Sequence, residues 1–334
     1  MTATRPTTTA GTEPADALPG SPAAASLLLS QGYRVERVEF PSTQDGVLLV
    51  GHLYLPGPAP AVTLLGPETF VKEQAPTQYA KRLANDGYVA LAFDPRYAGE
   101  SGGEPRRWED PLAKAEDVRA SVDHLATRPE VDADRIAGMA ICQGSSAMLR
   151  AAADEPRIRA LATAAGHDRD HRGDLVWLGG AEALAARRRR GEQARERYER
   201  SGQVEYVPAV DAWYAPWAAA GIWENRYAVV SDATLLDFES LSAARRLHTP
   251  WLMVHSDHSF LPAAARRHFD AVPPGTPKQL QWEGGTAHFR YYDDPVVMDR
   301  TAGLVHAWFR DQLDLPAPAS AHIPAAGQEG PAGG

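Results

Sequence analysis

The sequence predicts an α/β fold with a mostly parallel central sheet, helices on both faces and a helical cap insertion. Three observations support this prediction. Short apolar segments alternate with amphipathic segments over most of the chain, which is typical of parallel sheets covered by helices. The alternation stops for about eighty residues, 167–248, and then resumes. A strand, a sharp turn and a helix are expected around the single cysteine, Cys142.

The elements before the cysteine follow from apolar periodicity and turn residues. The first two strands are separated by PSTQDG, a turn-forming run, so they predict an N-terminal hairpin. The later apolar runs predict buried strands, and 3.6-residue spacing predicts the helices. In order, we expect strands over 33–40, 47–55 and 61–66, a helix over 78–85, a strand over 88–94, a helix over 111–127 and a strand over 135–141.

The chain after the cysteine contains a long departure from this alternation. Residues 167–248 are helical in pattern, charged and rich in Trp and Tyr. Such an insertion predicts a cap over the carboxyl ends of the strands, where ligands bind in open α/β sheets. The flanking elements are expected as a strand over 159–165, a strand over 250–256, a helix over 262–271, a strand over 278–283 and a helix over 295–313.

Composition limits the classes of function. The chain has 334 residues, 44% hydrophobic and 23% charged, as in globular proteins with a sizeable core. Its net charge of −9 argues against nucleic acid as the main partner, because phosphate binding needs a concentrated basic face. No apolar run approaches the ~20 residues that span a bilayer, so no membrane partner is expected. One cysteine excludes an internal disulfide and indicates a reducing, cytoplasmic location.

Composition also suggests boundaries. Both ends are rich in Ala, Pro and small polar residues and predict loosely held segments. The sequence does not determine the oligomeric state. The expected organisation is an arm over 1–30, a core over 31–166 and 249–315, a helical cap over 167–248 and a flexible tail over 316–334.

The pentapeptide Ala140-Ile141-Cys142-Gln143-Gly144 has small residues two positions on either side of the cysteine. This pattern is typical of a nucleophile held in a strained turn between a strand and a helix. The amino end of the helix would favour a thiolate there. An ordinary buried cysteine that packs as a small apolar residue is the alternative interpretation.

Partners for this nucleophile follow the last two strands. Asp257 comes directly after the strand 250–256, and His288 lies on a Gly-rich loop after the strand 278–283. A nucleophile, an acid and a histidine in this chain order, each at a strand end, form the α/β-hydrolase arrangement. We therefore expect Cys142, His288 and Asp257 to be catalytic. Asp257 as a helix cap, His258 as the base, and Asp293 or Asp294 as the acid are the alternatives.

The motifs GPETF, DPRYAGESGG, AICQG, SDHSFLP and GGTAHF carry a resemblance over residues 33–313. The chain resembles the α/β-hydrolase superfamily, and within it dienelactone-hydrolase-like members with a cysteine nucleophile. The resemblance implies that Glu68 contacts the resting thiol, with a solvated loop glutamate as the alternative. It also implies an oxyanion hole from the N–H groups of Thr69 and Gln143, and Pro67 leaves only Glu68 or Thr69 as the loop donor. The large cap is a departure, since dienelactone hydrolases are shorter.

The cap carries a group of aromatic residues that predicts a largely apolar substrate pocket, although each ring also fits a small core of the cap. The segment HDRDH over 167–171 has a spacing that a metal site could use, but an ordinary polar loop is favoured. We expect no metal and no cofactor. The pocket candidates are Trp213, Tyr214, Trp217, Trp223 and Tyr227.

These features predict an acyl hydrolase that forms an acyl-cysteine on an ester, lactone or thioester. Its partner is expected to be a small or carrier-bound acyl substrate. A biosynthetic acyltransferase or cyclase, in which another acceptor replaces water, is the enzymatic alternative. A non-catalytic, ligand-binding homologue is the alternative of another class.

Overall fold

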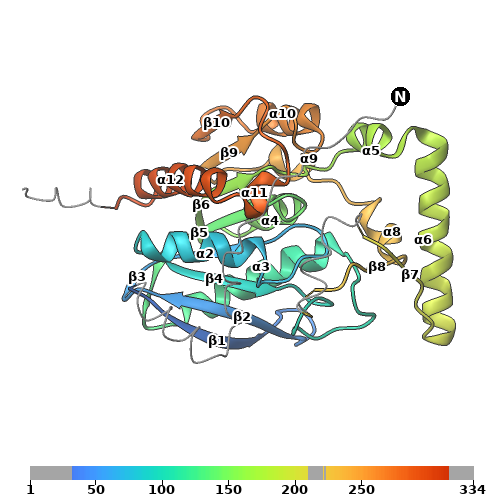
Figure 1. Ribbon diagram of the computed structural model, residues 1–334, viewed down its shortest axis with the longest axis horizontal. Helices are drawn as coiled ribbons and strands as arrows, with labels where there is room; N and C mark the ends of the chain where they lie inside the picture. Colours follow the sequence, from blue (N-terminus) through green and yellow to red (C-terminus); the bar gives the residue numbers. More distant parts are fainter. Residues whose placement is uncertain (1–31, 210–220, 222, 316–334) are drawn as a thin grey trace, which may run out of the picture.

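The computed structural model describes residues 32–209, 221 and 223–315, and its centre is a mostly parallel sheet of eight strands (Figure 1). β1 and β2 form the expected hairpin, β2 also pairs antiparallel with β4, and all remaining pairs are parallel. The predicted fold class is confirmed. Across the sheet the strands are β1 (Arg34–Pro41), β2 (Leu48–Leu55), β4 (Val89–Asp94), β3 (Ala59–Leu65), β5 (Val131–Ile141), β6 (Ile158–Ala164), β9 (Trp251–His255) and β10 (Lys278–Trp282).

Helices cover both faces of this sheet, and a separate apolar core lies on each face. One core contains residues of α2 and α12, and the other contains residues of α3, α4 and α10. Strands buried from both sides are mostly apolar, as β4 is from Val89 to Phe93, which explains why the apolar runs were clear in the sequence. These helices are α2 (Ala75–Asn85), α3 (Pro111–Ala126), α4 (Gly144–Asp154), α10 (Pro262–Ala271) and α12 (Pro295–Gln312).

The segment between β6 and β9 contains helices, as its pattern predicted, and also a small strand pair that the sequence did not predict. β7 and β8 pair antiparallel beside α6, a long helix that stands at one side of the molecule in Figure 1. Because β6 and β9 are neighbours in the sheet, the insertion leaves and re-enters between adjacent strands. Its elements are α5 (His171–Leu178), α6 (Ala181–Ser201), β7 (Tyr206–Val207), β8 (Tyr227–Ala228), α8 (Ser231–Leu235) and α9 (Leu241–Ala244).

The strand order reverses direction at β3 and β5, which are neighbours in the centre of the sheet. Chain connections diverge at such a point, so the carboxyl ends of the two strands are where ligands bind in open α/β sheets. The start of α4 packs tightly here. A Cβ on Gly144 would lie 2.5 Å from the Gly66 carbonyl oxygen and 2.8 Å from the Leu65 carbonyl oxygen. Only glycine allows this approach of α4 to β3.

Gly144→Ala tests this packing. We expect it to lower the free energy of unfolding by about 1–3 kcal/mol, because the added methyl group meets fixed backbone atoms. Gly303→Ala in α12 is the matched control, because a Cβ there meets nothing within 4 Å. This substitution should raise the free energy of unfolding by about 0.5–1 kcal/mol, since alanine favours a helix over glycine. Urea unfolding curves measure both values. Equal effects of the two substitutions would contradict the packing argument.

Candidate active site

Cys142 occupies the sharp turn between β5 and α4. Its φ is +53°, a left-handed conformation that is rare outside glycine and typical of a nucleophile turn. The Cys142 N–H donates to the Ala164 carbonyl oxygen at 3.2 Å, and the His167 N–H donates to the Cys142 carbonyl oxygen at 2.9 Å. The loop after β6 therefore holds the turn in place. The side chain is almost completely buried, with 7% of the residue exposed.

Three donors surround the sulfur. The backbone N–H groups of Gln143 and Glu68 and the Tyr292 hydroxyl lie near enough to the sulfur to lower the pKa of Cys142 by hydrogen bonding. The two backbone donors come from the start of α4 and from the loop after β3, the two segments from which the resemblance implies oxyanion-hole donors. Fixed donors of this kind commonly stabilise a developing oxyanion by about 3 kcal/mol each.

The backbone groups of Thr69, one of the expected oxyanion-hole donors, bond elsewhere in this structure. Thr69 has a φ of +64°, and its N–H donates to Oε1 of Glu109 at 2.8 Å. The Thr69 carbonyl oxygen accepts from the Trp223 indole at 2.7 Å. Of the two residues left open for the loop donor, Glu68 is the one whose N–H lies near the sulfur, and the role of Gln143 stays a prediction.

Tyr292 joins the cysteine to His288. Its hydroxyl lies 2.6 Å from Nε2 of His288 and also bonds to the Cys142 sulfur. Tyr292 belongs to α11 (Arg290–Asp293), a short helix that the sequence did not predict. The available signal was the position of Tyr292 four residues after the histidine, which places the two side chains together on one helical turn.

Asp257 does not orient His288. Its Oδ1 accepts from the Trp282 indole at 2.9 Å, and its side chain is 60% exposed. The Phe260 N–H, 3.2 Å away, donates instead to Nδ1 of His288. The alternative acid Asp294 caps α12 by accepting from Val296 and Val297. Strand order placed Asp257 at the correct sheet edge but could not determine the direction of its side chain.

Burial keeps both reacting groups neutral. It raises the pKa of Cys142 to about 12, and the negative charge of Glu68 acts in the same direction, whereas the Tyr292 and backbone donors lower it. Burial likewise lowers the pKa of His288 to about 3, with a further contribution from His255. The expected helix-stabilised thiolate is therefore not the resting form, since desolvation outweighs the helix terminus.

Glu68 lies close enough to Cys142 for their charges to interact, as the resemblance implied. Burial raises the pKa of Glu68 to about 7, and the neighbouring Glu109 adds to this effect. Lys114 forms a buried ion pair with Glu109 and donates to Oε1 of Gln143 at 3.4 Å. The sequence did not single out Glu109 or Lys114, which connect the loop after β3 to the start of α4.

Two of the predicted pocket residues are described, and both are buried. Trp223 packs against Phe70, with the ring centroids 6.2 Å apart, as well as bonding to Thr69. Tyr227 donates to Oδ1 of Asp232 at 2.7 Å and lies under the Arg187 guanidinium. Both therefore hold the walls of the site. The other three candidates, Trp213, Tyr214 and Trp217, lie outside the described residues.

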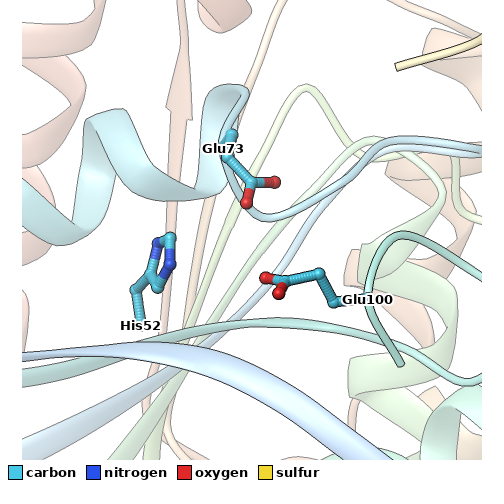
Figure 2. A group of neighbouring side chains, drawn as sticks. All are labelled: His52, Glu73 and Glu100. Atoms are coloured by element: carbon cyan, nitrogen blue, oxygen red, sulfur yellow. The ribbon is translucent and has the colours of Figure 1, made fainter. Parts of the chain in front are cut away.

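Among the described residues, a group that could hold a metal consists of His52, Glu73 and Glu100, whose ligand atoms face one another (Figure 2). The Lys72 ammonium already lies 2.7 Å from Glu73 and 2.6 Å from Glu100, and it also pairs with buried Asp94. A metal would have to compete with this cation, so the group is better explained as an ion-pair cluster.

The segment 167–171 has structural partners. Asp168 accepts from the Ser145 hydroxyl at 2.9 Å, and Asp170 caps α5 and pairs with Arg267. These contacts fit the ordinary polar loop favoured over a metal site. Within the described ranges, no helix is long and apolar enough to cross a membrane.

Comparison of sequences identifies relatives in bacteria and fungi, although no family model matches the chain. The chain is 29% identical to uncharacterized protein PA2218 of Pseudomonas aeruginosa over 307 residues, 83% of this chain and 81% of the relative. It is 34% identical over 125 residues to a thiohydrolase of Arthrinium phaeospermum, and 37% identical over 122 residues to a polyketide transferase of Gibberella fujikuroi. These two matches cover 37% and 35% of this chain, and 40% and 37% of the fungal relatives.

Comparison of structures identifies the fold. The crystal structure of PA2218 superposes with a TM-score of 0.71, at 26% identity, over 83% of this chain and 94% of the other. The α/β hydrolase GrgF of a Penicillium species gives 0.70, at 24% identity over 84% and 100% of the two chains. A dienelactone hydrolase of Anabaena variabilis gives 0.54, at 16% identity over 84% and 98%. The chain therefore has the α/β-hydrolase fold, as the motifs implied.

Glu68→Gln tests the electrostatic control of the thiol. Because the Glu68 charge raises the pKa of Cys142, its removal should lower the thiol titration by about one pH unit. The rate of alkylation by iodoacetamide as a function of pH reports the thiolate fraction. Glu104→Gln, at an exposed position, is the control and should leave the profile unchanged. An unchanged profile in Glu68→Gln would remove Glu68 from this role.

Proposed function

We propose that this chain is an acyl hydrolase that cleaves an ester, lactone or thioester through a covalent acyl-Cys142 intermediate. The observation that carries the proposal is the convergence of one sulfur, two backbone N–H donors and a hydroxyl bonded to an imidazole. The hydrolase fold and the thiohydrolase relative support the reaction class.

The first step forms the acyl-enzyme. The thiol proton passes to the Tyr292 oxygen while the Tyr292 hydroxyl proton passes to Nε2 of His288. The sulfur attacks the carbonyl carbon, a C–S bond forms, and the carbonyl π electrons move onto oxygen. The N–H groups of Gln143 and Glu68, which bond to the sulfur at rest, turn their hydrogen bonds to this oxyanion.

The tautomer of His288 controls this transfer. In the resting site the Phe260 N–H donates to Nδ1, so a neutral imidazole carries its proton on Nε2. Nε2 must lose that proton before it accepts another, so Nε2 gives its proton to water and Nδ1 takes a proton from water, which breaks the Phe260 contact. The resting and reactive forms of the site therefore differ in which nitrogen of His288 carries the proton.

The remaining steps return the proton and release the acyl group. The imidazolium delivers its proton through Tyr292 to the leaving oxygen or sulfur as the bond to the carbonyl carbon breaks. Water then attacks the acyl-cysteine and gives up a proton along the same path. The C–S bond breaks, and the sulfur regains its proton as the carboxylic acid leaves.

Transfer to another acceptor is the second candidate function. The similarity to a polyketide transferase favours it, since a hydroxyl or amine can replace water in the same acyl-enzyme. Partition of a trapped acyl-enzyme between water and added alcohols or amines separates hydrolysis from transfer.

Cys142→Ala tests the covalent step. Incubation of the protein with activated esters and thioesters should add one acyl mass to the wild-type chain and none to the variant, measured by intact-mass spectrometry. Because Cys142 is the only cysteine, the modified residue is unambiguous among thiols. Turnover that persists unchanged in Cys142→Ala and Cys142→Ser would refute the mechanism.

Tyr292→Phe tests the relay. Removal of the hydroxyl breaks the proton path between His288 and Cys142, and we expect kcat to fall about 10²-fold. Asp257→Asn is the comparison, because the exposed Asp257 side chain does not contact His288, and its kcat should change less than threefold. Steady-state kinetics with one thioester measure both. A larger loss in Asp257→Asn would restore Asp257 as the orienting acid.

A further inference from the structure

Arg169 is a buried cation whose guanidinium donates no well-aligned hydrogen bond within the described residues. The side chain is 0% exposed, and none of its three nitrogens has an aligned hydrogen-bond partner in the described part of the chain. Nη2 lies 2.8 Å from Oδ1 of Asp174, an ion pair without hydrogen-bond geometry. A buried donor left unsatisfied costs about 1–3 kcal/mol, and a charged donor costs more. The fold therefore retains a costly group here.

The position of Arg169 links it to the active site. It follows His167, which holds the nucleophile turn, and its own N–H donates to the Ser146 hydroxyl of α4 at 3.0 Å. The charge of Arg169 acts on Glu68, whose charge in turn acts on Cys142. The guanidinium is thus fixed between the nucleophile turn and the inserted segment.

A second cation lies beside it. The Arg169 guanidinium is 5.3 Å from the centre of the Trp177 ring, and the Arg187 guanidinium is 4.9 Å from the same centre. Arg187 also acts on Glu68, but its Nε donates an aligned hydrogen bond to Oδ1 of Asp232 at 2.8 Å. The ion pair of Arg169 with Asp174 lacks such a bond, so Arg169 is the guanidinium of the two whose donors are available to a ligand.

Other buried polar atoms near the turn also lack hydrogen-bond partners. Among the described residues these include Nε2 of His167, Nε2 of Gln143 and Oγ1 of Thr69. Burial lowers the pKa of His167 well below its usual value, so its ring is neutral. Together with Arg169, these polar atoms would be better satisfied by a ligand rich in oxygen than by a hydrocarbon chain.

The donors of Arg169 indicate the chemistry of its ligand. All three of its side-chain nitrogens lack an aligned hydrogen-bond partner among the described residues, so they suit a negatively charged acceptor. A planar guanidinium also matches the two oxygens of a carboxylate.

We propose that Arg169 is a substrate-binding residue that receives a carboxylate of the substrate. The substrate class is an ester or thioester that carries a second, ionised carboxyl group, such as the half-thioester of a dicarboxylic acid. This inference rests on the proposed acyl hydrolase function, and it assigns Arg169 a binding role with no part in proton transfer.

The test compares substrates with and without the carboxylate. Glutaryl and pentanoyl thioesters of N-acetylcysteamine have the same chain length and differ in the terminal group. In a second arm, the pentanoyl group is carried by 3-mercaptopropionate, which places the carboxylate on the leaving group. We expect the wild type to prefer one carboxylate substrate over neutral pentanoyl-N-acetylcysteamine by about 30–100-fold in kcat/KM. The preferred arm shows which side of the scissile bond faces Arg169.

The variant is Arg169→Met combined with Asp174→Asn, so that no unpaired acid remains buried. It should lose the preference, so that kcat/KM for the preferred carboxylate thioester falls to within about threefold of kcat/KM for the neutral thioester. Arg96→Met with Asp117→Asn removes another buried pair, 2.7 Å apart, and should keep the preference. The role of Arg169 is overturned if the wild type shows no preference for a carboxylate thioester in either arm. It is also overturned if the Arg169→Met, Asp174→Asn variant keeps that preference.

A binding measurement separates this inference from the proposed function. Glutarate should protect Cys142 of the wild type from iodoacetamide and should not protect the Arg169→Met, Asp174→Asn variant. Absence of an acyl-enzyme with every substrate would refute the hydrolase, while protection by glutarate would still support the carboxylate site. An acyl-enzyme with no protection and no preference would retain the hydrolase and overturn the site.

Discussion

The approach of α4 to the end of β3 is the constraint on which the site depends. Gly144 lies against the Gly66 and Leu65 carbonyl oxygens, and the preceding Cys142 adopts a φ of +53°. This geometry brings the sulfur to the N–H groups of Gln143 and Glu68, which come from two different strand ends. A larger residue at 144 would separate α4 from β3 and, with them, the two donors. One backbone contact thus determines the position of the thiol and of the oxyanion hole.

Burial determines the electrostatics of the site. It raises the pKa of Cys142 and lowers that of His288, so both are neutral although a helix begins at the thiol. Charged groups nearby occur in pairs, such as Glu109 with Lys114 and Arg169 with Asp174, because an isolated buried charge is costly. In the proposed mechanism, a neutral thiol and a neutral imidazole exchange a proton only when a substrate is present. Such an arrangement protects a thiol from oxidation.

The proposed substrate site uses the inserted segment rather than the sheet alone. Trp177 and Arg187 belong to α5 and α6, and both lie beside Arg169 from the loop after β6. The sheet supplies the thiol and the donors common to hydrolases, whereas the insertion adds the groups that select a substrate.

The sequence by itself determined the α/β class, the positions of the sheet strands along the chain and the turn that carries Cys142, because apolar periodicity and small residues report local backbone structure. It also indicated Glu68 as a neighbour of the thiol through motif resemblance. Only the tertiary structure shows that the Thr69 N–H bonds to Glu109 and that the Asp257 side chain bonds to Trp282. It also shows that Tyr292 contacts His288 on the side of Cys142. These outcomes depend on side-chain directions and on partners far apart in the chain, which a local pattern does not encode.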